Sequence, residues 1–172
     1  MDRIKAAVRA IPDFPIEGIL FRDIMPVLRD GDLLNQTVQY FVEHLQGKSV
    51  DYIVGIESRG FILGVPLACK LGVGFVPIRK KGKLPGPVAR HEYDLEYGSD
   101  IIEVQADAVP RGSRVVVMDD LLATGGTAAA TINLLNTLEA DIVSVLFMIE
   151  LADLAGRDKL PAGTEMHAMI RY

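Results

Sequence analysis

Tryptophan is missing from this chain, and cysteine occurs only once in its 172 residues. A single cysteine excludes a disulfide within the chain and is typical of a reducing compartment. Cys69 lies in the apolar sequence 65–71, so we expect a packed and unreactive thiol. No apolar run approaches the ~20 residues that cross a bilayer, and no signal-peptide core follows the N-terminus. These absences predict a cytoplasmic protein with no membrane partner.

An excess of positive charge is also missing, because the net charge is −5 at pH 7. This balance gives no general reason to expect a nucleic acid as partner, so the basic cluster at 79–83 must serve a local purpose. An RNA contact is the second interpretation of that cluster, and the acidic balance opposes it. The chain is instead rich in apolar residues, 49% in all, with few aromatics, which is typical of an α/β core. Its length predicts one domain over residues 1–172.

Strand and helix patterns alternate along the chain. The first unit has a strand at 52–56, a helix at 61–71 and a strand at 75–78, with a proline in the helix that allows a kink or a late start. The second has a strand at 114–118, a helix at about 128–138 and a strand at 142–149. This alternation predicts an α/β fold with a central, mostly parallel sheet flanked by helices.

Two other regions do not follow this alternation of strands and helices. Residues 82–87 are rich in Gly and Pro and predict a mobile loop, and residues 92–97 and 101–105 predict a hairpin. Together they predict a lid over residues 79–107. Residues 1–30 hold several prolines, so we expect an irregular cap without a sheet strand, followed by a helix from about 32 to 45.

The most informative run is residues 114–127, RVVVMDDLLATGGT. A buried strand is followed by Asp119 and Asp120, where the strand should end, and then by a loop that leads into a helix. Backbone N–H groups at a helix N-terminus bind phosphate, and paired carboxylates accept hydrogen bonds from two sugar hydroxyls. The run therefore predicts a site for a phosphorylated ribose; the alternative is a turn whose glycines serve only geometry. The predicted phosphate loop consists of Ala123, Thr124, Gly125, Gly126 and Thr127.

A second turn occupies the corresponding place after the strand at 52–56. Its residues Glu57, Ser58 and Arg59 include a guanidinium, whose forked donors suit the dense charge of pyrophosphate. The alternative is a surface salt bridge, worth ~0–1 kcal/mol. Arg79, Lys80 and Lys83 begin the predicted lid and could cover the same anion, unless they form only a solvated loop.

The hairpin supplies a further titratable candidate. Glu96, beside Tyr97, could move a proton on a heterocyclic base, although a glutamate in an exposed strand is usually only solvated. The three histidines, His44, His91 and His167, show no metal-ligand spacing. We expect Mg²⁺ to enter through substrate phosphates instead.

The run at 117–127 resembles the loop with which type I phosphoribosyltransferases bind 5-phosphoribosyl-1-pyrophosphate (PRPP). Further segments, in the same order, resemble the adenine-specific family of these enzymes: DFP at 13–15, GILFRDI at 18–24, ESRGF at 57–61, RKKGKLPG at 79–86 and LEYG at 95–98. The resemblance implies a type I phosphoribosyltransferase fold. It also implies purine salvage, in which 5-phosphoribose passes from PRPP to N9 of adenine and gives AMP and pyrophosphate with Mg²⁺.

The resemblance also implies roles for individual residues. Residues 1–30 would form a hood in which Phe21 and Leu121 sandwich the adenine ring, while backbone groups near Leu20 and Arg22 read its edge. Asp119 and Asp120 would hold the ribose hydroxyls, and Glu96 would manage a proton on the base. The phosphate loop would hold the 5′-phosphate. Pyrophosphate would meet Glu57, Ser58, Arg59, Arg79, Lys80 and Lys83. A homodimer is implied as well.

Two alternatives stay open at this point. One is a phosphoribosyltransferase for hypoxanthine, guanine or xanthine. The other is a regulator that senses PRPP without catalysis, although the chain has no spare length for a nucleic-acid-binding region.

Overall fold

The computed structural model describes residues 1–94 and 99–172. They form two compact units, Met1–His44 and Leu45–Tyr172, each described below by itself. The predicted site residues Glu96 and Tyr97 lie outside the described residues. The single domain expected over residues 1–172 stays a prediction, as do the bounds of the hood and the lid.

The first unit combines three helices with a two-stranded sheet. Its helices are α1 (Asp2–Ala7), α2 (Met25–Leu28) and α3 (Gly31–His44), and its strands β1 (Arg9–Ile11) and β2 (Phe21–Asp23) pair antiparallel. The helix expected at about 32–45 is confirmed. The expectation that residues 1–30 contain no strand is wrong, because the prolines at 12 and 15 lie in the connection between β1 and β2 and leave both strands intact.

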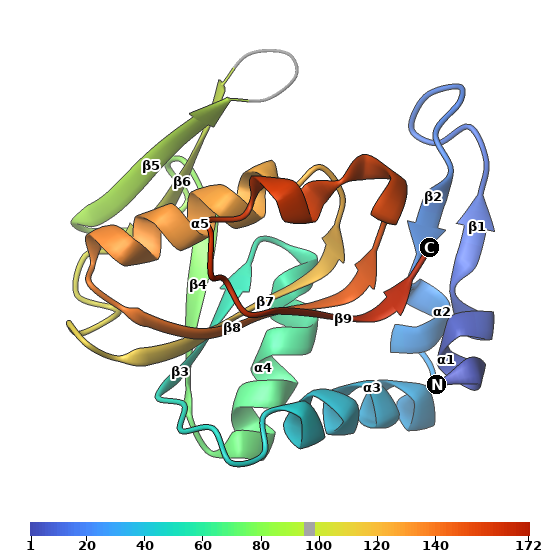
Figure 1. Cartoon of the computed structure of the whole chain (residues 1–172), viewed down its shortest axis with the longest axis horizontal. Coiled ribbons are helices and arrows are strands. Elements are labelled where there is room, and N and C mark those ends of the chain that lie inside the picture. Colours follow the sequence, from blue (N-terminus) through green and yellow to red (C-terminus); the bar gives the residue numbers. More distant parts are fainter. Residues whose placement is uncertain (95–98) are drawn as a thin grey trace. The chain divides into compact units, whose positions relative to one another are not determined.

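A seven-stranded sheet organises the described residues of the second unit (Figure 1). Its order is β5-β6-β4-β3-β7-β8-β9; β3 pairs parallel with β4 and β7, and β8 pairs parallel with β7 and β9. Strand β6 pairs antiparallel with both β4 and β5. The predicted α/β class with a mostly parallel sheet is confirmed. The strands are β3 (Tyr52–Ile56), β4 (Gly74–Lys80), β5 (Val88–Asp94), β6 (Ser99–Gln105), β7 (Arg114–Leu122), β8 (Asp141–Glu150) and β9 (Met166–Arg171).

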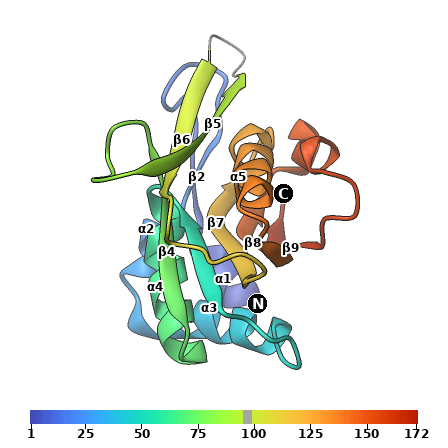
Figure 2. The same cartoon turned by 90° about the vertical axis from the view of Figure 1, so that its left-hand side faces the viewer.

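Two helices cover the sheet from opposite sides (Figure 2). Helix α4 (Arg59–Leu71) packs on β3, β7 and β4, and α5 (Gly126–Thr137) packs on β5 and β8. Strand β7 lies between them, and its residues Val115 to Met118 are fully buried. Their unbroken apolar sequence reflects burial on both faces, as expected for a central parallel strand. Among the described residues, no helix is both long and apolar enough to cross a membrane.

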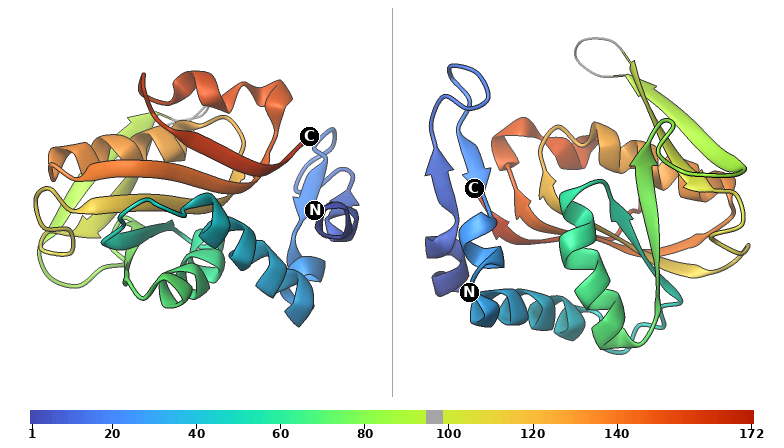
Figure 3. Two further views of the ribbon diagram at one scale, coloured as in Figure 1. Left: turned by 60° about the horizontal axis from the view of Figure 1, so that its bottom comes forward. Right: turned by 180° about the vertical axis from the view of Figure 1, so that it is seen from behind.

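Several local expectations need correction. Strand β7 does not end at residue 118 but continues to Leu122 in pairing with β8, so Asp119 and Asp120 lie within the strand. Cys69 is exposed, because it lies on the face of α4 that points away from the sheet. Strand β9 and the two short 3₁₀ helices before it, η1 (Ala152–Leu154) and η2 (Gly156–Lys159), were not expected from the sequence. Figure 3 follows this C-terminal region beside β7 and β8 from two further directions.

The two faces of α4 provide a stability test. Leu63 is 1% exposed against the sheet, whereas its neighbour Ile62 is 42% exposed. We expect Leu63→Ala to lower the free energy of unfolding by about 2–5 kcal/mol, because it removes buried contacts and leaves a cavity. Ile62→Ala, the matched control, should change it by less than about 0.5 kcal/mol. Urea unfolding of both variants measures the difference, and equal losses would contradict the assigned packing.

Candidate active site

The parallel register of β3, β4 and β7 places the chain segments that follow these three strands at one edge of the sheet. Ile56 at the end of β3 lies opposite Ile78 in β4, and Gly55 lies opposite Met118 in β7. The amide of Glu57 donates to the carbonyl of Ile78 at 3.0 Å, which extends β3 into the turn before α4. In open α/β sheets, ligands bind beyond this carboxyl edge. The segments that the sequence singles out therefore meet at one edge of the second unit.

Gly60 fixes how closely the first turn approaches β7. A Cβ atom at this position would lie 2.5 Å from the carbonyl oxygen of Met118 and 3.1 Å from Oδ1 of Asp119. Only a residue without a side chain allows α4 to begin so near the strand. The backbone of this turn thus lies directly against Met118 and Asp119.

Asp119 and Asp120 point to opposite faces of the sheet, because successive side chains along a strand alternate. Asp119 lines a small cavity, of about 100 Å³, together with Leu121 and Phe147. Asp120 is buried on the other side, where its Oδ2 receives the Arg59 guanidinium at 2.9 Å. Asp120 is therefore paired with the first residue of α4, whereas Asp119 lines the cavity before α5 and also lies close to Gly60.

Both carboxylates are harder to ionise than a solvated aspartate. Burial raises the pKa of Asp119 well above its ordinary value, and the neighbouring charge of Asp120 raises it further. Burial also raises the pKa of Asp120, although the Arg59 guanidinium partly offsets the effect. A cationic ligand or a partly positive reacting group at this position would relieve the repulsion between them.

The predicted phosphate loop forms the rest of the cavity wall. Residues 123–127 line it, and α5 begins within the loop at Gly126, after Gly125 in a left-handed conformation with φ +81°. The first N–H groups of a helix have no partner within the helix, and the helix dipole favours negative charge there. This geometry suits an anion, and the phosphate site that the sequence indicates stays a prediction.

Gly156 packs against this loop, and no motif in the sequence indicated its role. A Cβ atom on Gly125 would overlap the carbonyl oxygen of Gly156 in η2, and one on Gly156 would overlap the carbonyl oxygen of Ala123. The loop and η2 thus pack backbone against backbone. Because Gly156 lies about 30 residues from the loop in sequence, no local pattern reveals the contact.

An ion pair holds η2 in place. Arg157 Nε and Nη2 donate to the two oxygens of Glu150 at 2.6 and 2.7 Å, and the Glu150 side chain is 4% exposed. The Arg157 hydrogen bonds lower the pKa of Glu150, although burial opposes them. The amide of Leu151 also donates to the carbonyl of Leu122 at 2.9 Å. These contacts tie the segment after β8 to the end of β7 and so support the phosphate loop.

Glu57 gathers two of the predicted cations. Its oxygens accept from Arg79 Nε at 3.2 Å and from Lys83 Nζ at 2.5 Å, and from the Lys80 amide at 2.9 Å. Burial alone raises the pKa of Glu57, but the hydrogen bonds from Lys83, the Lys80 amide and Arg79 outweigh it and lower the pKa to about 2. Glu57 is therefore an anion that positions basic side chains at the sheet edge. Ser58, the next residue, immediately precedes the N-terminus of α4.

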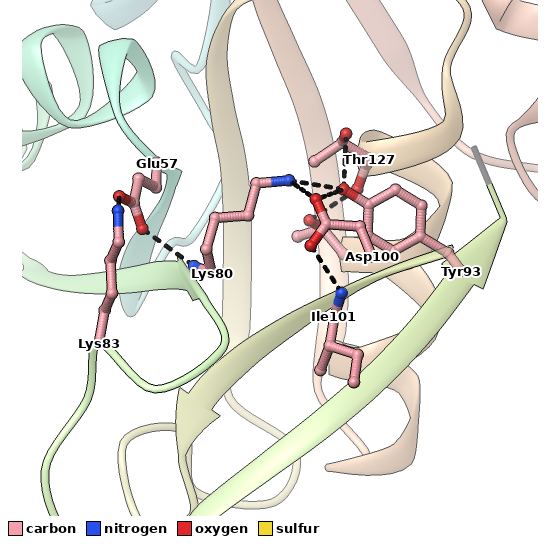
Figure 4. A network of polar contacts seen from close by, with 8 residues as sticks. Glu57, Lys80, Lys83, Tyr93, Asp100, Ile101 and Thr127 are labelled. Carbon is pink, nitrogen blue, oxygen red and sulfur yellow. Dashed lines mark hydrogen bonds and ion pairs between the residues drawn. The ribbon is translucent and has the colours of Figure 1, made fainter. Parts of the chain in front are cut away.

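Lys80 takes a different direction from Arg79 and Lys83. Its ammonium group pairs with Asp100 and donates to the Tyr93 hydroxyl at 2.9 Å (Figure 4). Burial lowers its pKa, but the contacts with Asp100 and Tyr93 raise it by more, so Lys80 stays charged. The structure therefore groups Arg79 and Lys83 around Glu57 and separates the Lys80 side chain from them.

The residues predicted to bind a base divide between the two units. Leu121 lines the cavity of the second unit. Leu20, Phe21 and Arg22 belong to the first unit, where Phe21 packs edge to face against Phe14 with ring centroids 5.1 Å apart. Leu20 is 46% exposed, and with Phe14 and Ile16 it leaves an apolar surface on this unit.

The side chains of this site offer few ligands for a metal ion. In the described residues no group of three or more His, Cys, Asp and Glu side chains is arranged to hold one. The carboxylate of Asp119 in the cavity wall is a hard oxygen ligand of the kind Mg²⁺ prefers. A Mg²⁺ ion carried mainly by substrate phosphates fits this donor set.

Comparison with known proteins identifies the family of this chain. The family model described as phosphoribosyl transferase domain matches residues 32–162. An adenine phosphoribosyltransferase from Acaryochloris marina is 55% identical over 98% of this chain and 99% of its own length, and one from Clostridium botulinum (strain Loch Maree) is 49% identical over 98% of both. The chain belongs to the adenine phosphoribosyltransferase family.

Solved structures of the family share its fold. The adenine phosphoribosyltransferase of Thermoanaerobacter pseudethanolicus superposes with a TM-score of 0.96 at 47% identity, over 99% of both chains. The Saccharomyces cerevisiae enzyme, solved with adenine and an imino-altritol bisphosphate, has a TM-score of 0.94 at 45% identity, over 98% of this chain and 97% of that one. The type I phosphoribosyltransferase fold is thereby established for this family member.

The low pKa of Glu57 predicts a pH-dependent contribution to stability. Its folded pKa, about 2, lies below the ordinary value of 4.5, so the contribution is present above pH 4.5 and is lost as the pH falls towards 2. We expect Glu57→Gln to be less stable at pH 7, by at most about 3 kcal/mol. The gap to the wild type should close between pH 4.5 and 2, as measured by urea unfolding. Glu17→Gln, at an exposed position, is the control, and a gap independent of pH would contradict the assignment.

The contact behind the phosphate loop predicts a specific loss of anion binding. Gly156→Ala should push the Ala123 carbonyl out of place and weaken the binding of ribose 5-phosphate at least tenfold, as measured by calorimetry. Gly31→Ala is the matched control, since a Cβ atom there meets nothing within 4 Å. Unchanged ribose 5-phosphate binding in Gly156→Ala would refute the role given to this contact.

Proposed function

We propose that this family member transfers 5-phosphoribose from PRPP to N9 of adenine, giving AMP and pyrophosphate, with the residues of the β7 edge as its active site. The observation that carries the assignment of the site is the cavity formed by Asp119 and the phosphate loop at the N-terminus of α5. The cavity combines a phosphate site with a carboxylate for the sugar, which is the chemistry that a phosphorylated ribose requires.

The phosphate loop binds the 5′-phosphate in this proposal. Backbone N–H groups of residues 124–127 and the hydroxyls of Thr124 and Thr127 supply donors, while η2 keeps the loop in position. Asp119 and Asp120 accept hydrogen bonds from the ribose hydroxyls. Their negative charge stabilises the positive charge that develops on the ribose ring as the bond to pyrophosphate breaks.

Pyrophosphate leaves towards the first turn and the end of β4. Arg59, Arg79 and Lys83 supply positive charge there, with Ser58 at the start of α4, whereas the Lys80 side chain turns to Asp100 and Tyr93. Glu57 holds Arg79 and Lys83 beside the site, so it acts on pyrophosphate through these two side chains. When bound, Mg²⁺ supplies charge neutralisation on the phosphate oxygens of PRPP, beside the carboxylate of Asp119.

Adenine specificity rests on the hood in this proposal. Phe21 and Leu121 stack on the two faces of the ring, and backbone groups near Leu20 and Arg22 pair with N1 and the 6-amino group. A 6-oxo purine presents the opposite donor and acceptor pattern, and each buried polar group left unpaired costs about 1–3 kcal/mol. Glu96 manages the proton on the base. A homodimer and a cytoplasmic location complete the proposal.

The deciding experiment measures product formation from PRPP and Mg²⁺ with adenine, hypoxanthine, guanine and xanthine in parallel. We expect AMP from adenine and no turnover of the three oxo-purines. Preference for an oxo-purine would keep the PRPP site and overturn the base assignment. Binding of PRPP without turnover of any base would favour a regulator.

A variant in the hood tests the contact with adenine separately. Phe21→Ala should reduce kcat/KM for adenine by a factor of ten or more, because a stacked aromatic face is lost. Exposed Ile16→Ala, on the same unit, is the control. Equal rates for wild type and Phe21→Ala would remove Phe21 from the adenine site.

A further inference from the structure

A polar network connects the phosphate loop to β4, β5 and β6 (Figure 4). The Tyr93 network consists of Lys80, Tyr93, Asp100 and Thr127. The Tyr93 hydroxyl lies 3.2 Å from Oγ1 of Thr127 and 3.4 Å from Oδ2 of Asp100, and it accepts a hydrogen bond from Lys80 Nζ at 2.9 Å. Tyr93 is only 9% exposed, so its hydroxyl must find its partners within the protein.

The number of protons in the network limits which bonds can form together. Lys80 is charged and can only donate, so it occupies a lone pair of the Tyr93 oxygen. The single Tyr93 proton must then point to Thr127 or to Asp100. Asp100 already receives the Lys80 ammonium and the Ile101 amide, the latter at 2.8 Å. Thr127 is the nearer of the two acceptors, because its Oγ1 lies 3.2 Å from the Tyr93 hydroxyl whereas Oδ2 of Asp100 lies 3.4 Å away.

A phosphate in the loop fixes the direction of the bond between Tyr93 and Thr127. The Thr127 hydroxyl has one proton, and a phosphate oxygen offers only lone pairs to it, so Thr127 must donate to the phosphate. Its oxygen then accepts the Tyr93 proton. The bonds run in one direction, from Lys80 through Tyr93 and Thr127 to the anion, and each bond polarises the next.

We propose that Tyr93 is a positioning residue that orients the Thr127 hydroxyl toward the 5′-phosphate. This inference rests on the proposed function, because it takes the loop at residues 123–127 as the phosphate site. Tyr93 does not touch the substrate in this account. Its hydroxyl prepares Thr127 as a donor before the substrate arrives, which lowers the ordering cost of binding.

Tyr93→Phe tests the proposal, since it removes the hydroxyl and keeps the buried ring. The bond to Thr127 acts equally in the bound substrate and in the transition state, so KM for PRPP should rise about 3- to 10-fold with kcat changed less than twofold. Ribose 5-phosphate should bind more weakly by the same factor. Pyrophosphate alone, which lacks the 5′-phosphate, should bind as it does to the wild type.

A double-mutant cycle with Thr127→Val separates orientation from general structure. When Thr127 has no hydroxyl, removing that of Tyr93 should weaken ribose 5-phosphate binding no further. Tyr52→Phe is the matched control, because Tyr52 begins β3 at the opposite end of that strand from the site. Thermal unfolding of each variant identifies any that does not fold, and Thr127→Ser, which keeps the hydroxyl, should retain the response to Tyr93→Phe.

Three outcomes would overturn the proposal: unchanged KM for PRPP in Tyr93→Phe, equal weakening of ribose 5-phosphate and pyrophosphate, or a full effect of Tyr93→Phe in the Thr127→Val background. AMP formation by the wild type distinguishes a failure of the role of Tyr93 from a failure of the proposed function. AMP formation by the wild type together with any of these outcomes would reject only the role of Tyr93. If the wild type turns over no base, the proposed function fails, while ribose 5-phosphate binding still tests the network.

Discussion

The alternation of side chains along β7 is the constraint on which the site depends. Two adjacent aspartates in an extended strand cannot share one face, so Asp119 opens to the turn before α5 and Asp120 to the turn before α4. Because β7 is central and its neighbours run parallel to it, both turns lie at the same sheet edge. Two adjacent residues thus supply one carboxylate to the cavity of the phosphate loop and one to the Arg59 guanidinium. A shift of one residue along the strand would exchange the faces and separate each carboxylate from its partner.

The basic side chains near this edge are already paired with carboxylates. Arg59 contacts Asp120, Arg79 and Lys83 contact Glu57, and Lys80 contacts Asp100. Such pairing reduces the side-chain entropy that an incoming anion must remove, and it holds positive charge in place without repulsion among the cations. The same pairing limits which anions can bind to these basic side chains. Only an anion with more charge and more acceptor oxygens than a carboxylate competes well for these donors.

The sequence predicted those parts of the fold that local patterns encode. The buried strand at 114–118, the helices near 61–71 and 128–138 and the hairpin all appear, because hydrophobic period and glycine positions determine them locally. The clustering of Asp119, Arg59 and the loop at 123–127 also followed from strand-turn-helix order. What the sequence could not reveal depends on distant contacts: Gly156 behind the loop, the Glu150–Arg157 pair, and the Tyr93 hydroxyl beside Thr127. Strand β7 is longer than expected because its pairing with β8 continues through Asp119 and Asp120 to Leu122.

The contact between Gly125 and Gly156 has a consequence for the order in which the protein is made. Synthesis proceeds from the N-terminus, so β3, β4, β7 and α5 leave the ribosome before η2 does. A nascent chain that ends at β8 has the complete Gly-rich sequence but lacks the backbone that presses it into shape and the arginine that anchors that backbone. The anion site is therefore among the last features to mature. We expect a fragment with most of the sheet already folded to bind a phosphorylated sugar more weakly than the full chain does.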